Sequence, residues 1–125
     1  MKIILYNKNN YNKQFVYNYL KHYMLKLVDE LYSSKKCKQL SQKLNVNILS
    51  VIKYSINTLI ISTTNDSYIL SINKNIRYKD YNLKALINYI NYGDREIKGY
   101  RLLYNIFEYV VKNIDSIYKE WLDGY

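Results

Sequence analysis

Residues 58–73 read TLIISTTNDSYILSIN, and this stretch decides the fold class. Two short runs rich in isoleucine, threonine and tyrosine, residues that favour strands, flank Asn65 and Asp66, which tolerate tight turns. In the second run Tyr68, Leu70 and Ile72 alternate along the chain, as residues on one face of a strand do. The stretch therefore predicts an antiparallel β-hairpin.

The residues before the hairpin, 48–56, read ILSVIKYSI and share its β-branched composition. Ile48, Ile52, Tyr54 and Ile56 fall largely on one face of an extended chain, which predicts a further strand. The predicted strand region, including the hairpin, therefore covers residues 48–73.

A helix is predicted on the N-terminal side, over residues 11–33. Apolar residues recur there at intervals of three and four: Val16, Leu20, Met24, Leu27 and Leu31. This spacing predicts one amphipathic helix of about five turns that covers a side of the sheet. Residues 34–47 are rich in lysine and have few apolar anchors, so they are expected to form a basic connector, as a loop or a short helix.

Helices are also predicted on the C-terminal side. Residues 81–92 carry apolar side chains at helical spacing, with Asp80 as the expected N-cap and Gly93 as the expected C-terminal stop in a left-handed conformation. Residues 100–122 continue as a final helix with a buried line of Leu103, Ile106, Phe107, Val110, Ile114, Ile117 and Trp121. We therefore expect one α+β domain over residues 1–125, with a long N-terminal helix and C-terminal helices packed on a small antiparallel sheet.

The charge of this 125-residue chain is strongly positive, with 19 basic and 10 acidic residues and a net charge of +9. Residues 1–46 hold nine lysines against Asp29 and Glu30, whereas residues 94–125 hold five basic and six acidic side chains. Such polarity suits either a nucleic-acid surface or subunits that stack basic face on acidic face. The 17 tyrosines allow two interpretations: a tyrosine-rich interface, or replacement of phenylalanine at half-buried positions where the hydroxyl reaches a partner.

Residues that catalyse reactions or bind metals are scarce. The single histidine, His22, and the single cysteine, Cys37, cannot form a Cys/His metal site, and the three glycines are too widely spaced for a phosphate-binding loop. We predict that the chain is not an enzyme and has no cofactor, metal or small-molecule substrate. A polar cleft that gathers His22 with several carboxylates would contradict this prediction. The apolar run at the N-terminus is too short to span a membrane, so no membrane association is expected.

Residues 87–99 read INYINYGDREIKG and hold two of the three glycines. This stretch and the start of the final helix resemble the tail-completion, or head-to-tail joining, proteins of tailed bacteriophages, a minor tail component family. The matching residues are Tyr89, Tyr92 and Gly93 at the end of a helix, and Lys98, Gly99, Leu103 and Phe107 after it. The sequence departs from the family pattern at Asn91, where an acid is common, at Tyr100–Leu102, which replace a proline–phenylalanine pair, and before the first strand, where a threonine–glycine pair is missing.

The resemblance implies a non-enzymatic virion protein of the neck or tail, made in the host cytoplasm. Such a protein assembles with itself into a ring and contacts other virion proteins: the portal, the adaptor and the tail tube. The residues expected to make subunit contacts are Tyr89, Tyr92, Gly93, Asp94, Arg95, Glu96, Lys98 and Gly99.

Two alternatives remain open from the sequence. One is a small nucleic-acid-binding protein whose phosphate contacts come from clustered ammonium groups. Its candidate contact residues are Lys13, Lys21, Lys26, Lys35, Lys36 and Lys38. The other is a phage-encoded inhibitor of host defence, which would act by covering a nucleoprotein.

Overall fold

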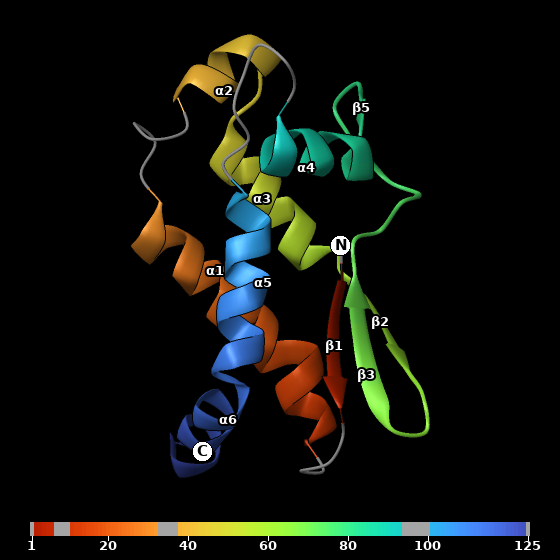
Figure 1. Cartoon of the computed structure of the whole chain (residues 1–125), viewed down its shortest axis with the longest axis vertical. Helices are drawn as coiled ribbons and strands as arrows, with labels where there is room; N and C mark the ends of the chain where they lie inside the picture. Colours follow the sequence, from red (N-terminus) through yellow and green to blue (C-terminus); the bar gives the residue numbers. More distant parts are fainter. Residues whose placement is uncertain (1, 7–10, 33–37, 94–100, 125) are drawn as a thin grey trace.

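The computed structural model of the chain describes residues 2–6, 11–32, 38–93 and 101–124 (Figure 1). The strands are β1 (Lys2–Tyr6), β2 (Ile60–Thr63), β3 (Ser67–Ser71), β4 (Arg77–Tyr78) and β5 (Tyr81–Asn82). The helices are a π-helical segment η2 (Phe15–Tyr19), then α1 (Leu20–Leu31), α2 (Lys38–Leu44), α3 (Ile48–Asn57), α4 (Leu83–Tyr92), α5 (Leu102–Lys112) and α6 (Ile114–Gly124). The fold is α+β, as the sequence predicted.

The main sheet has three antiparallel strands in the order β1-β3-β2. Its buried face carries two cross-strand pairs from β1 and β3, Ile3 with Leu70 and Leu5 with Tyr68. In Figure 1 the helices lie on one side of this sheet, and α5 packs against β1. The second sheet is a two-stranded ribbon, β4 with β5, that leads into α4.

The predicted hairpin is confirmed as β2 and β3. The pairing runs from Ile60 opposite Ser71 to Thr63 opposite Tyr68. The Thr64 N–H donates to the Ser67 carbonyl at 2.9 Å and closes the turn around Asn65 and Asp66. Strand β1 was not predicted, because its partner β3 lies far along the chain and a short apolar run alone does not indicate a strand.

The predicted strand over residues 48–56 is wrong, because these residues form helix α3. The Asn47 side chain caps this helix by accepting from the Ser50 N–H. Its buried residues follow helical spacing: Ile48, Val51, Ile52, Ser55 and Ile56. Lys53 points to α1, where it pairs with Asp29 at 2.5 Å. Helix periodicity and capping therefore outweigh the strand preference of the β-branched side chains here.

The first predicted helix, 11–33, is present in a shorter and less regular form. Helical backbone runs from residue 13 to Leu31, with π-helical turns at Phe15–Tyr19 before α1. Four residues of the predicted apolar line are buried, but Leu31 is exposed. The connector predicted over 34–47 contains the helix α2, and residues 33–37 lie outside the described residues.

The C-terminal predictions also need correction. Asn82, not Asp80, caps α4, because the Asn82 side chain accepts from the Ala85 N–H. The single helix predicted over 100–122 is divided at Asn113 into α5 and α6. The break lets α6 turn away from the α5 axis and reach the N-terminal helical segment, as Figure 1 shows at the C-terminal end of the chain.

The seam between α6 and residues 11–19 is built from aromatic rings. Phe15 is fully buried, and its ring centroid lies 4.7 Å from that of Tyr118 and 5.6 Å from that of Trp121. The Tyr11 hydroxyl donates to Asp115 Oδ1 at 2.8 Å. Elsewhere the buried Tyr32 hydroxyl donates to the Leu102 carbonyl at 2.8 Å. These tyrosines therefore act as core residues whose hydroxyls have partners, the second of the two interpretations of the tyrosine excess.

Candidate functional site

The predicted subunit-contact residues that the structure describes lie at the end of α4. Tyr89 is half-buried, and the Lys43 ammonium lies 5.9 Å from its ring centroid. Tyr92 is 59% exposed. Gly93 donates its N–H to the Tyr89 carbonyl at 2.7 Å and ends the helix, as predicted. Its φ of 71° and ψ of −161° are not the expected left-handed helical angles but belong to a region that is essentially restricted to glycine.

The other predicted contacts, Asp94, Arg95, Glu96, Lys98 and Gly99, lie outside the described residues. The helices before and after these residues, α4 and α5, are joined through Asn91, which is fully buried. The Asn91 carbonyl accepts from the Arg101 N–H at 3.0 Å, and its Oδ1 accepts from the Tyr104 N–H at 3.3 Å. Asn91 therefore supplies a cap to the first turn of α5, where Arg101 makes no capping hydrogen bond with its side chain.

Replacing Asn91 with alanine is expected to lower the free energy of unfolding by about 1–2 kcal/mol, since α5 loses a cap and the half-buried Tyr104 N–H loses its acceptor. The matched control is Asn88→Ala on the exposed side of the same helix, where a change of about 0.5 kcal/mol or less is expected. Urea denaturation followed by circular dichroism measures both. Equal losses in the two variants would contradict the capping role of Asn91.

A groove lies beside Tyr92, between the start of β1 and the outer side of α5. It has a volume of about 350 Å³ and is lined by Lys2, Tyr92, Tyr104, Phe107, Glu108, Val111 and Lys112. We call it the corner groove. Most of its lining is apolar, and Val111 on its wall is 44% exposed. Tyr92 and Val111 thus expose aromatic and aliphatic surface at one concave place, and aromatic side chains are enriched in surfaces that contact another protein.

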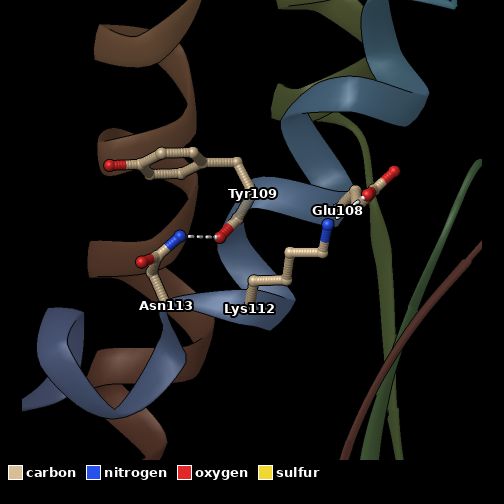
Figure 2. A network of polar contacts seen from close by, with 4 residues as sticks. All are labelled: Glu108, Tyr109, Lys112 and Asn113. Carbon is tan, nitrogen blue, oxygen red and sulfur yellow. Dashed lines mark hydrogen bonds and ion pairs between the residues drawn. The ribbon is translucent and has the colours of Figure 1, made fainter.

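Polar side chains on α5 border this groove (Figure 2). Lys112 Nζ donates to Glu108 Oε1 at 2.6 Å, which lowers the pKa of Glu108 and raises that of Lys112. The Asn113 side-chain amide donates to the Tyr109 carbonyl at 2.8 Å and covers the end of the helix. The Tyr109 ring extends instead toward α1. There the pKa of Tyr23 is raised to about 12, mainly by burial and to a smaller extent by a hydrogen bond with Tyr109. Helix α5 is thus attached to α1 on one side and presents the groove on the other.

The candidate nucleic-acid lysines do not form a purely basic face. Lys13, Lys26 and Lys38 are exposed, Lys21 donates to the Asn57 carbonyl at 3.5 Å, and Lys35 and Lys36 lie outside the described residues. Lys26 lines a groove together with Glu30 on α1 and Glu120 on α6. The arrangement therefore gives phosphate contact no specific support.

That groove between α1 and α6 is also where the histidine lies. Its lining includes Tyr23, His22, Lys26, Glu30 and Glu120. It therefore brings His22 near two carboxylates, the kind of cleft that would contradict the absence of a reaction centre. All three side chains are exposed, whereas catalytic acids and bases are usually tuned by burial or by a close charged partner. The absence of enzymatic activity therefore stays a prediction.

The described part of the chain contains no cluster of three or more histidine, cysteine, aspartate or glutamate residues that could hold a metal ion. None of the helices described is both long and apolar enough to cross a lipid bilayer.

Comparison with known proteins found no match among family models, curated proteins or solved structures. The functional argument therefore rests on the residues of this chain. Sequence reasoning reached Tyr92 and Gly93 through a motif, but it missed the capping role of Asn91 and the corner groove. The groove joins β1 to α4 and α5, and no local signal indicates that these segments meet.

Proposed function

We propose that this chain is a non-enzymatic structural protein of the neck or tail of a tailed bacteriophage. It assembles into a ring that joins the portal or adaptor of the head to the tail. The observation that carries the proposal is the corner groove next to Tyr92. An exposed tyrosine and an exposed valine border an apolar hollow at the helix end that the family resemblance marks for subunit contact.

The groove suits a contact between unlike surfaces, because it is concave and apolar and has Lys2, Glu108 and Lys112 at its border. Contacts between two different patches of the same chain are heterologous, and such contacts close into rings when the rotation between subunits allows it. Aromatic side chains in a desolvated pocket commonly dominate the affinity of such interfaces. Tyr92 is therefore the residue whose loss should affect assembly most.

The test is genetic disruption of the gene in the virus that encodes the protein, followed by electron microscopy of lysates. DNA-filled heads and separate tails are expected. Complementation with Tyr92→Asp should restore fewer than about one tenth of the joined particles, because a carboxylate buried without a partner in an apolar contact is costly. Leu122→Asp, which changes a 54% exposed apolar residue on α6, is the matched control and should restore joining.

Joined, infectious particles from the disrupted gene would overturn the proposal. Full complementation by Tyr92→Asp would instead leave the neck role in place and exclude the corner groove as its contact surface. Mass spectrometry of purified particles provides an independent check, because a neck protein must be present in the virion.

A further inference from the structure

Strand β2 forms an open edge of the main sheet. It pairs with β3 on one side, and no other described strand lies on its second side. Figure 1 shows β2 at the margin of the molecule, on the side away from the helices. Its outward backbone groups are thus available to another chain.

The register of β2 against β3 identifies which backbone groups point outward. Thr64 and Ser67 form a hydrogen-bonded pair at the turn, since the Thr64 N–H donates to the Ser67 carbonyl. Such pairs alternate along an antiparallel ladder, so the next one is Ser62 with Ile69. The intervening residues Ile61 and Thr63 therefore direct their N–H and C=O groups away from β3.

The side chains around this edge are uncharged. Residues 54–65, between Lys53 and Asp66, are the longest stretch of the chain without a charged residue. Proteins usually protect edge strands with lysine, proline or a bulge, and β2 contains no lysine or proline and pairs with β3 in continuous register. Ile60 in addition leaves 43% of its surface exposed. A chain of net charge +9 repels its own copies, so an uncharged edge is where two copies can approach at least electrostatic cost.

We propose that β2 pairs antiparallel with β2 of a second copy of this chain, around a twofold axis that passes through Ser62. In this register Ile61 of each copy lies opposite Thr63 of the other, and the outward groups of both residues meet their complements. The register also keeps the helices of both copies on the same face of one continuous six-stranded sheet. The match is self-complementary. Pairing with β1 of another copy, with the helices of both copies kept on the same face, would be parallel and slightly less stable per residue.

This twofold contact does not depend on the proposed neck function. It uses an edge of the sheet, whereas the corner groove lies at α4 and α5. The two surfaces can therefore be tested by separate variants, and failure of one leaves the other unaffected.

Disulfide trapping tests the register directly, with Cys37→Ser as the background for every variant. A non-hydrogen-bonded antiparallel pair brings the two Cα atoms to about 4.5 Å, within the range of a disulfide. Ser62→Cys is therefore expected to form a covalent dimer in glutathione buffer, seen on a non-reducing gel. Ile60→Cys is the matched control, because its copies would lie about 14 Å apart along the strand, and cross-linking should be at least about tenfold slower. A mixture of Ile60→Cys and Thr64→Cys chains should form the mixed dimer, since these positions are opposite each other.

Backbone donation is tested without any cysteine. Thr63→Pro removes an N–H that points away from β3, so the fold and its melting temperature should be retained, while sedimentation velocity should show at least about tenfold weaker dimerisation. Thr63→Val keeps the N–H and should dimerise like the wild type. Equal cross-linking rates for Ser62→Cys and Ile60→Cys, wild-type chains that stay monomeric up to about 1 mM, or undiminished dimerisation of a folded Thr63→Pro chain would each overturn the proposal.

Discussion

Replacing Phe15 with alanine is expected to lower the free energy of unfolding by about 3–5 kcal/mol, the usual cost of removing a buried phenylalanine. Phe15 has no exposed surface, and it joins the N-terminal helical segment to α6 through Tyr118 and Trp121. The alanine would leave a cavity between rings that belong to distant parts of the chain. Since a domain of this size is stable by only about 5–15 kcal/mol, this loss is a large share of its stability.

The measurement is urea denaturation followed by the fluorescence of Trp121, the single tryptophan of the chain. Tyr17→Ala is the matched control, because Tyr17 lies in the same π-helical segment but is exposed, and its loss should cost about 1 kcal/mol or less. Should the alanine variant fail to fold, Phe15→Leu keeps most of the apolar volume and should still fold. Its urea midpoint should be lower than those of the wild type and Tyr17→Ala. Similar losses for Phe15→Ala and Tyr17→Ala would contradict the packing of α6 on this residue.

The elements that the sequence predicted well are those encoded by adjacent residues. The hairpin depends on two strand-forming runs around Asn65 and Asp66, and the end of α4 depends on Gly93. Each of these signals lies within a few residues of the feature that it predicts. The same reasoning failed at residues 48–56, where β-branched composition suggested a strand although Asn47 and the spacing of the buried residues were already consistent with a helix. Over residues 48–56, helical periodicity and the Asn47 cap outweigh strand propensity.

The features that could not be predicted depend on contacts between distant residues. Strand β1 exists because β3 pairs with it, and the division of the last helix at Asn113 lets α6 reach Phe15. Asn91 is another such case: its partners, Arg101 and Tyr104, follow a segment outside the described residues. A polar residue in an apolar helical stretch gives no indication from sequence alone that it caps the next helix.

Replacing Gly93 with valine is expected to lower the free energy of unfolding by about 2–3 kcal/mol, because a β-branched side chain is forced into backbone angles that only glycine adopts readily. The backbone at Gly93 has φ 71° and ψ −161°, and the N–H must keep its 2.7 Å bond to the Tyr89 carbonyl. Relief of the strain would therefore require loss of the bond that ends α4. Thermal unfolding followed by circular dichroism measures the effect as a lower melting temperature.

Gly124→Val is the matched control, because a Cβ atom at Gly124 would meet no atom within 4 Å. Its melting temperature should stay close to that of the wild type. Gly93→Ala separates backbone strain from crowding: alanine is not branched, so it should retain most of the loss if the positive φ is the cause. If Gly93→Val had the same melting temperature as Gly124→Val, the end of α4 could adopt other backbone angles at little cost. The angles at Gly93 would then not be what determines where this helix stops.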